Sequence, residues 1–200
     1  TEELLYDRLS FRRFCGIGLD GSIPDETTLC RFRSALKGKT DKLFQLVMDD
    51  IACQGIQLKG GTIVDASVIE ASVRPPQGGC ISRKDPEAGW TKKAGTFTYG
   101  YKAHVAACAE TGLVKKVLAT SADVHDSQAL KAVVDKSATY VTADKAYDSQ
   151  ELRHHLQKHG IKDQILYKKK RNHQQPHWQT EKNKLWSKTR CRIERIFGHW

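Results

Sequence analysis

The order of the short apolar runs after Gly60 constrains this chain more than any other feature, because β-branched stretches alternate with stretches of helical periodicity. G-G-T-I-V-D-A follows a glycine turn and predicts a buried strand that ends near Asp65. T-Y-V-T-A-D predicts another short strand that also ends in an acid, Asp144. Between them, two strand-like segments flank Glu110-Thr111-Gly112 and predict a hairpin. These strands must pair across long stretches of chain.

The remaining segments complete this order. The periodicity predicts helices over 126–136, 149–159 and 180–200 and a strand over 164–167, whereas the prolines and glycines of 71–96 predict an extended polar loop. From residue 60 the order is strand, two-stranded hairpin, helix, strand, helix, strand, helix, which is that of a ribonuclease H-like fold. We therefore expect residues 59–200 to form an α/β domain with a mixed sheet flanked by helices.

The first 58 residues are predicted to form a small all-helical region. Leu4, Leu5 and Leu9 lie on one apolar stripe, and turn residues then precede a second helical pattern for which Asp25 or Thr27 is the expected N-cap. The chain starts inside a helical pattern without a methionine and stops inside another. We therefore expect both termini to be cut, with the C-terminus truncated.

The charge balance favours a polyanionic partner. The chain has 33 Lys and Arg against 23 Asp and Glu, a net charge of +10, and basic side chains on phosphates release condensed counterions. A merely basic protein would have the same charge. No apolar run approaches the ~18 residues that a membrane span needs, so we expect no membrane association. The six cysteines form no C-x-x-C pair, which is typical of reduced thiols in a cytoplasmic protein.

Three acidic residues lie in apolar or cationic surroundings: Asp65 in T-I-V-D-A, Asp144 in V-T-A-D-K and Glu194 in R-C-R-I-E-R-I-F. Burial of a carboxylate is unfavourable unless it is paired or coordinated. Neighbouring strands could present both aspartates at one edge of a sheet, with the last helix packed across them. Such a set suits phosphoryl transfer with two metal ions, because Mg²⁺ prefers oxygen ligands. Alternatively, the aspartates are strand-end turn residues and Glu194 pairs with Arg190 on its helix.

Basic residues in three segments are candidates for DNA contacts, through their charge or through aromatic neighbours. The alternatives are a solvated strand face, a solvated loop, and helix surface charge around a buried Phe32. The candidates are Lys102 and His104 in Y-G-Y-K-A-H; Lys168, Lys169, Lys170 and Arg171 in K-K-K-R; and Arg31 and Arg33 in R-F-R.

The D-V-H-D motif at 123–126 has two interpretations. Its mixture of oxygen and nitrogen ligands could form a metal cluster. The helical pattern that follows favours a capping role instead, with Asp126 or Ser127 as the N-cap.

Taken together, the motifs resemble DDE transposases of the insertion-sequence-five type, within the insertion-sequence-four superfamily, over nearly the whole chain. The segment F-R-R-F-C-G-I-G-L-D-G-S-I-P-D-E-T-T-L-C-R-F-R-S-A-L (11–36) resembles the N-terminal helical domain of that family. T-I-V-D-A-S-V-I-E-A (62–71), Y-G-Y-K-A-H (99–104) and A-T-S-A-D-V-H-D-S (119–127) are similar to its first catalytic strand, its second strand and the segment after its third. A-D-K-A-Y-D-S (143–149) resembles its second aspartate motif, and R-C-R-I-E-R-I-F-G (190–198) its glutamate helix.

Matching positions assign roles by this resemblance. They imply that Asp65, Asp144 and Glu194 are the catalytic, metal-binding carboxylates, and that Arg190 is the DNA-contacting arginine of the superfamily's Y-R-E-K signature. Two positions depart from the signature: its tyrosine falls at Ser187, and its lysine would lie beyond Trp200. The phosphate contacts of those two residues are then absent, or are supplied by Trp186, Lys188 and a further tail.

The resemblance implies a transposase that cuts insertion-sequence ends with Mg²⁺ or Mn²⁺, as two ions, and joins the freed 3′ hydroxyl to target DNA. Its implied partners are double-stranded DNA and a second copy of itself in a synaptic homodimer, in the bacterial cytoplasm, with residues 1–58 as the DNA-binding region. Two alternatives stay open. One is a DNA-binding remnant without activity, and the other is a ribonuclease H-like, metal-dependent nuclease without strand transfer.

Overall fold

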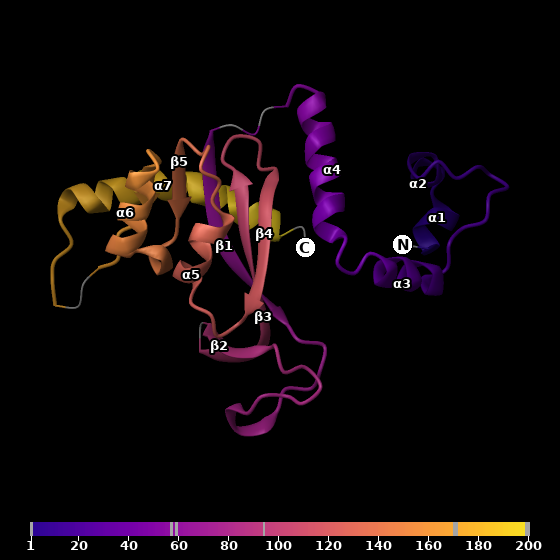
Figure 1. Ribbon diagram of the computed structural model, residues 1–200, viewed down its shortest axis with the longest axis horizontal. Coiled ribbons are helices and arrows are strands. Elements are labelled where there is room, and N and C mark those ends of the chain that lie inside the picture. The colour runs from indigo at the N-terminus through magenta and orange to yellow at the C-terminus, as the bar shows by residue number, and fades with distance from the viewer. Residues whose placement is uncertain (1, 57, 59, 94, 170–171, 199–200) are drawn as a thin grey trace. The chain divides into compact units, whose positions relative to one another are not determined.

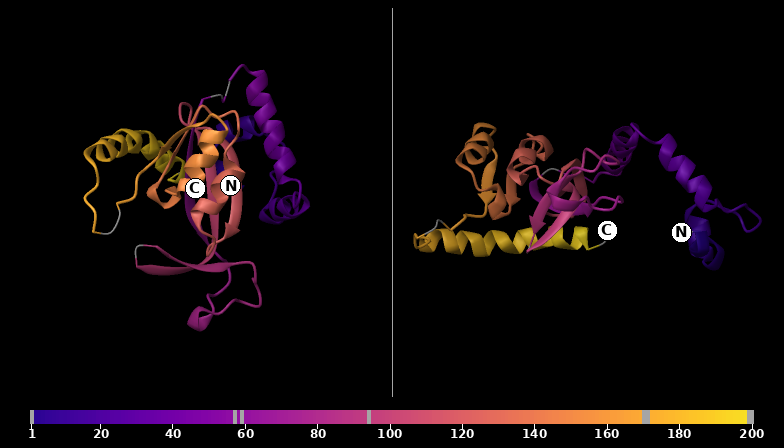
Figure 2. Two further views of the ribbon diagram at one scale, coloured as in Figure 1. Left: turned by 60° about the vertical axis from the view of Figure 1, so that its left-hand side comes forward. Right: turned by 90° about the horizontal axis from the view of Figure 1, so that it is seen from below.

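The computed structural model describes residues 2–56, 58, 60–93, 95–169 and 172–198. The chain divides into two compact units, Thr1–Ile56 and Gln57–Trp200. Figures 1 and 2 show a set of helices in the first unit and a sheet with helices on both faces in the second. None of the described helices combines the length and the apolar character needed to cross a lipid bilayer.

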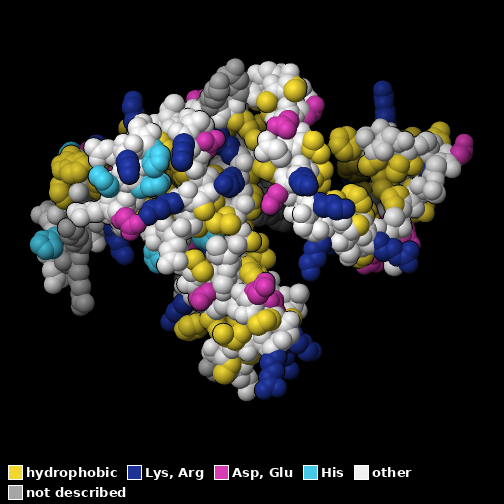
Figure 3. Space-filling model, viewed as in Figure 1, with side chains coloured by type: hydrophobic (Ala, Val, Ile, Leu, Met, Phe, Trp, Pro, Cys, Tyr) yellow, Lys and Arg dark blue, Asp and Glu magenta, His cyan; other side chains and the backbone are white. Residues whose placement is uncertain are grey.

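The N-terminal unit contains four helices: α1 (Glu2–Asp7), α2 (Leu9–Phe14), α3 (Glu26–Ala35) and α4 (Thr40–Cys53). Asp25 is the N-cap of α3, as one of the two sequence alternatives had it, because its carboxylate accepts a hydrogen bond of 2.7 Å from Thr28 N. The hydrogen bond from the Thr27 hydroxyl, followed by those from Thr28, lowers the pKa of Asp25 to about 2. Many large apolar side chains of this unit are exposed, and Figure 3 shows them spread over its helices.

The second unit is built on a six-stranded mixed sheet. Its strands follow the order β2-β3-β1-β5-β6, with β4 also paired to β3. β1 pairs antiparallel with β3 and parallel with β5, and β5 pairs parallel with β6. This arrangement confirms the predicted α/β class and is consistent with a ribonuclease H-like fold. The strands are β1 (Gly61–Glu70), β2 (Gly89–Lys93), β3 (Thr96–Cys108), β4 (Val114–Ser121), β5 (Tyr140–Ala143) and β6 (Lys162–Ile165).

Two sequence predictions about the strands are wrong. β1 continues past Asp65 to Glu70, because the long strand β3 pairs with it as far as Gly100. β2 lies inside the stretch that was predicted to be a loop, and it is held by pairing with the beginning of β3. Gly100 permits this crowding, because a Cβ atom added there would lie 2.1 Å from the carbonyl oxygen of Ile69.

The helices of this unit cover both faces of the sheet. Figure 2 shows α7 on the face opposite to α5 and α6. The adjacent residues Ile63 and Val64 of β1 are both fully buried and belong to different clusters: Ile63 packs with Ile193 of α7, and Val64 with Leu130 of α5 and Leu156 of α6. The helices are α5 (Asp126–Val133), α6 (Gln150–Lys158) and α7 (His177–Phe197), with short 3₁₀ turns η1 (Gln77–Gly79) and η2 (Lys145–Tyr147).

All six cysteines are free thiols, as expected from their spacing. Cys108 is buried at the end of β3, and the other five are exposed. The fold of this unit therefore rests on strand pairing and on the two apolar layers.

Candidate active site

Asp65 of β1 and Asp144, the residue after β5, follow neighbouring positions of two adjacent strands. β1 and β5 run parallel with Val64 paired to Ala143, so that each aspartate is the residue after a paired position. Asp144 directly follows β5 and is the N-cap residue of η2. The proximity of the two carboxylates has an electrostatic effect, because the charge of Asp144 contributes to raising the pKa of Asp65. The parallel register therefore brings together two acids that are far apart in the sequence.

The Asp65 carboxylate is largely removed from solvent, with 20% of its side chain exposed. Burial is the main cause that raises the pKa of Asp65, while a hydrogen bond of 2.9 Å from Ala66 N and the positive charge of Arg190 oppose that rise. The pKa nevertheless lies above its usual value. Folding thus holds an acid where its ionised form is unfavourable, as is common where a side chain serves chemistry rather than stability.

Arg190 links Asp65 to Glu194. The helix α7 packs against β1 and β5, and the Arg190 guanidinium donates from Nη1 to Asp65 Oδ2 at 2.9 Å and from Nη2 to Glu194 Oε1 at 3.0 Å. Glu194 lies one helical turn after Arg190 and is 58% exposed. The pairing of Glu194 with Arg190, expected from one interpretation of the sequence, is present. Because Arg190 binds both Asp65 and Glu194, the pair of Arg190 with Glu194 is part of the candidate site.

Tyr147 is a residue of this site that sequence reasoning missed. Its side chain is fully buried at the end of η2, and its hydroxyl has no hydrogen-bond partner in the described structure. Burial, followed by the charges of Asp126, Asp65 and Asp144, raises the pKa of Tyr147. One feature of the sequence could have indicated its burial: an aromatic residue lies three positions after Asp144 in an otherwise polar segment, and a surface turn does not require an aromatic residue.

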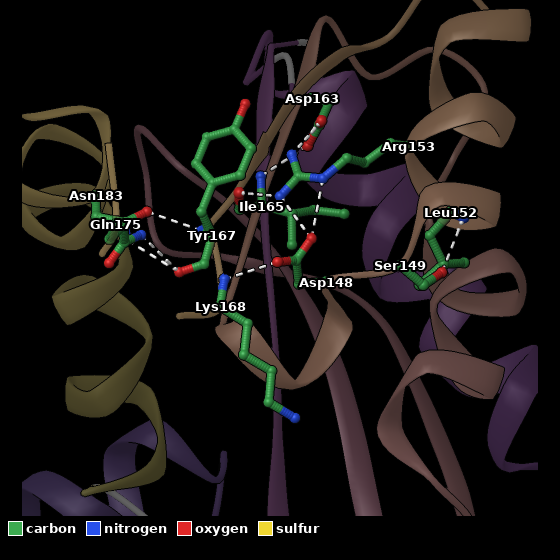
Figure 4. A network of polar contacts seen from close by, with 10 residues as sticks. All are labelled: Asp148, Ser149, Leu152, Arg153, Asp163, Ile165, Tyr167, Lys168, Gln175 and Asn183. Carbon is green, nitrogen blue, oxygen red and sulfur yellow. Dashed lines mark hydrogen bonds and ion pairs between the residues drawn. The ribbon is translucent and has the colours of Figure 1, made fainter. Parts of the chain in front are cut away.

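Arg153 of α6 organises the turn that follows Asp144 (Figure 4). Its Nε and Nη2 atoms lie 3.1 and 2.9 Å from Asp148 Oδ1, and Nη2 also donates to the Ile165 carbonyl at 2.9 Å. Its Nη1 atom pairs with Asp163 of β6. The other Asp148 oxygen accepts a hydrogen bond of 2.6 Å from Lys168 N. This single guanidinium therefore ties the turn to α6, to β6 and to the segment after β6.

The segment after β6 is held in turn by α7. Asn183 accepts from Tyr167 N at 2.8 Å and donates to the Tyr167 carbonyl at 3.1 Å, and Gln175 donates to the same carbonyl at 3.3 Å. The Tyr167 ring lies beneath the Arg153 guanidinium, 4.1 Å from ring centroid to Cζ. It also packs against Trp186, which is 8% exposed. Trp186 is therefore a core residue and does not replace the missing tyrosine of the signature.

Two basic residues proposed as DNA contacts have internal partners instead. His104 is fully buried, because it shares a strand face with Ala106 of the core, and its Nε2 atom lies 2.9 Å from Thr120 Oγ1. Lys102 is 13% exposed, donates to the Val124 carbonyl at 2.8 Å and pairs with Asp126 at 3.0 Å. Both interpretations, a DNA contact and a solvated strand face, are wrong for His104, which is buried. Lys102 is bound to Val124 and to Asp126, at the beginning of α5.

The D-V-H-D motif caps a helix, as the favoured interpretation expected, but one residue earlier than predicted. His125 is the N-cap of α5, and its Nδ1 atom accepts from Ser127 N at 3.3 Å. Neither this motif nor the three candidate acids form a ready metal cluster: across the described ranges, no group of three or more His, Cys, Asp or Glu side chains is placed to hold an ion. At the candidate site, Arg190 occupies the position between Asp65 and Glu194.

The other basic candidates are on the surface. Lys168 and Lys169 are exposed beside a hollow of about 460 Å³, whereas Lys170 and Arg171 lie outside the described residues. Arg31 and Arg33 are exposed on α3 of the N-terminal unit. Phe32 between them is 58% exposed, so the expectation that it is buried is wrong.

Comparison with known protein families matches both parts of the chain. The family model described as the transposase DDE domain matches residues 56–200, and the model described as a transposase domain of the DUF772 type matches residues 1–35. The chain belongs to the DDE transposase domain family. Membership is compatible with the insertion-sequence-five type, and it supports a role for this transposase in acting on DNA. No solved structure matches the chain.

Proposed function

We propose that this DDE transposase cuts the ends of an insertion sequence and joins them to target DNA, with Asp65, Asp144 and Glu194 as its catalytic carboxylates. One observation carries the proposal. β1 and β5 pair in parallel, so that Asp65 and Asp144 each follow a paired position, and Arg190 connects Asp65 to Glu194 on α7. These three residues come from β1, from the turn after β5 and from α7, and their carboxylates supply the oxygen ligands that two-metal phosphoryl transfer uses.

The chemistry of these residues fits divalent ions, which the family generally uses. All three side chains offer the hard oxygen ligands that Mg²⁺ and Mn²⁺ prefer. Burial, and to a smaller extent the negative charge of Asp144, raises the pKa of Asp65, and an arginine already compensates Asp65 and Glu194. We infer that two ions would be held by Asp65, Asp144 and Glu194. The chemistry supplied there is stabilisation of the attacking and leaving oxygens of an in-line displacement at phosphorus.

The chain's own residues have separate tasks in this proposal. β1 and β5 fix the two aspartates rigidly, and the Arg153 network fixes the turn after Asp144. Glu194 is exposed on α7 and is paired with Arg190. With the acids neutralised, the Arg190 guanidinium would be free to bind the phosphate that is cut, because arginine binds phosphate and carboxylate with the same geometry.

Other parts of the proposal rest on family membership. The N-terminal unit would contact the element ends, with Arg31 and Arg33 as candidate residues, and two copies of the chain would hold two ends together. A cytoplasmic location belongs to the same proposal. The alternatives predict different products: a remnant binds DNA without cutting it, and a simple nuclease cuts without joining.

The test is cleavage of DNA that carries the element's own ends, with Mg²⁺, by the full-length protein. Asp144→Asn keeps the shape of the side chain and removes its charge, so we expect cutting to be lost and DNA binding in EDTA to be retained. Asp123→Asn is the matched control, because Asp123 is an exposed acid in the capping motif. Normal cutting by Asp144→Asn would refute the assignment of the acids. Cut ends that never join target DNA would favour the nuclease.

A further inference from the structure

Two hollows lie next to each other along α7 and share one residue, Gln175. The larger, of about 740 Å³, lies between α7 and the residue that follows Asp144. The smaller, of about 460 Å³, lies between the Arg153 network and the first turn of α7. We call the pair the basic trough. Its key lining residues are Lys145, Lys184 and Lys188 in the larger hollow, Lys168 and Lys169 in the smaller, and Gln175 in both.

The acids that line the trough are already neutralised. Glu181 pairs with Lys184 at 3.0 Å. Asp148 pairs with Arg153 at 2.9 Å and accepts a hydrogen bond from Lys168 N. Two acidic residues therefore line the trough, both of them paired with basic residues, and cationic side chains are in excess.

Four lysines supply the excess charge: within the described part of the chain, Lys145, Lys168, Lys169 and Lys188 have no acidic partner. In Figure 4 the Lys168 side chain points away from the Arg153 network, while its backbone N–H is used by that network. Unpaired lysines concentrated along these two adjacent hollows create a positive potential that attracts a polyanion. The beginning of α7 lines the smaller hollow and adds the positive end of a 21-residue helix.

The trough begins beside the candidate active site. Lys145 is the residue after Asp144, and Lys188 precedes Glu194 on α7 by fewer than two helical turns. Ser187, at the position of the signature's missing tyrosine, lines the same hollow as Lys188. A phosphate chain lying in the trough would pass, at one end, Lys145, the neighbour of Asp144 in the chain. The lysines would supply backbone contacts at a place where the signature's tyrosine is absent.

We propose that the basic trough binds the phosphodiester backbone of the DNA strand that leads away from the phosphate to be cut, with Lys145 and Lys188 nearest to that phosphate and Lys168 and Lys169 farther along. This inference rests on the proposed function, because it takes Asp144 as the cutting end. The contacts are to phosphate, so they add affinity without reading base sequence.

The experiment measures DNA affinity by fluorescence anisotropy in EDTA, across about 50 to 200 mM salt. It compares the full chain with two double variants, Lys145→Gln with Lys188→Gln and Lys168→Gln with Lys169→Gln. Each lost phosphate contact lowers the salt slope by about 0.9 on duplex DNA, so each double variant should lower it by about 1.8. The control, Lys116→Gln with Lys158→Gln, removes the same charge from exposed sites outside the trough and should leave the slope unchanged.

A second readout fixes the position of the strand. Methylphosphonate groups, which lack the phosphate charge, replace single phosphates next to the cleavage position of the labelled DNA. Their effect on affinity should be seen with the wild type and lost with the Lys145 and Lys188 double variant. Trough variants whose salt slopes equal that of the control overturn the trough while leaving cutting by the wild type intact. A wild type that binds the DNA with the expected slopes and fails to cut it overturns the proposed function alone.

Discussion

Arg190 Nη1 lies 2.9 Å from Asp65 Oδ2, and this ion pair joins α7 to β1 across 125 positions of sequence. The same guanidinium reaches Glu194, so one arginine compensates two of the three candidate carboxylates. A divalent cation would compete with it for the same oxygens. Arg190 therefore has two roles in this account: it stabilises the metal-free site, and it becomes a phosphate ligand when the acids are neutralised by ions.

Replacement of Arg190 by Met should destabilise the metal-free protein by about 1–3 kcal/mol, because Asp65 keeps its burial and loses its cationic partner. Urea unfolding in EDTA measures this loss. Mn²⁺ should then raise the melting temperature more in the variant than in the wild type, since no arginine competes for the acids. Arg195→Met is the control, because Arg195 is exposed on the same helix. An equal Mn²⁺ effect in wild type and variant would show that Arg190 and the ion do not compete.

Arg153→Met should cost about 2–4 kcal/mol of stability, somewhat less than a fully buried pair, because Arg153 is 18% exposed. It leaves Asp148 and Asp163 without their partner and frees the turn after Asp144. Cutting should therefore fall more than DNA binding, and Arg153→Lys should restore part of both.

The matched control for Arg153 is Lys131→Met. It removes an exposed ion pair between Lys131 of α5 and Glu151, which lies on α6 with Arg153. Exposed pairs contribute little, so its unfolding free energy should change by less than about 1 kcal/mol. Equal losses in the two variants would show that the Arg153 network has no special role.

The sequence predicted where strands and helices form better than it predicted which strands pair with one another. The β-branched runs around Asp65 and before Asp144 form strands, and Asp25 caps α3. The continuation of β1 to Glu70 could not be predicted, because it depends on pairing with a strand about thirty residues away. β2 was missed for the same reason, since its local sequence is that of a polar loop and only β3 makes it a strand.

The sequence named the acids of the candidate site, an assignment that stays a prediction, but it did not indicate their surroundings. Alternation in β3 shows that Lys102 and His104 share a face, yet it does not show that α5 covers that face. The burial of Tyr147 and the bridge through Arg190 also depend on how distant elements pack. The spacing of residues on α7 indicated the pair of Arg190 with Glu194, but not the contact of Arg190 with Asp65.

The burial of His104 leads to a pH dependence. Burial is the main cause that lowers the pKa of His104 below 6.5, with Lys102 acting in the same direction and Asp126 against it. The stability due to a neutral, buried His104 is complete above this value and is lost as the pH falls, because the unfolded chain takes up the proton first.

Unfolding free energies at about pH 7 and pH 5 should thus differ more in the wild type than in His104→Gln. The control is His154→Gln, since His154 is exposed on α6. A wild-type pH dependence that survives in His104→Gln but disappears in His154→Gln would contradict this reasoning.

The central claim is that Asp65, Asp144 and Glu194 bind the same cations, and Mn²⁺ binding followed by electron paramagnetic resonance tests it most directly. The account predicts that Asp65→Asn, Asp144→Asn and Glu194→Gln each weaken Mn²⁺ binding by at least about tenfold, while Asp123→Asn binds as the wild type does. Wild-type affinity in both aspartate variants would contradict the claim.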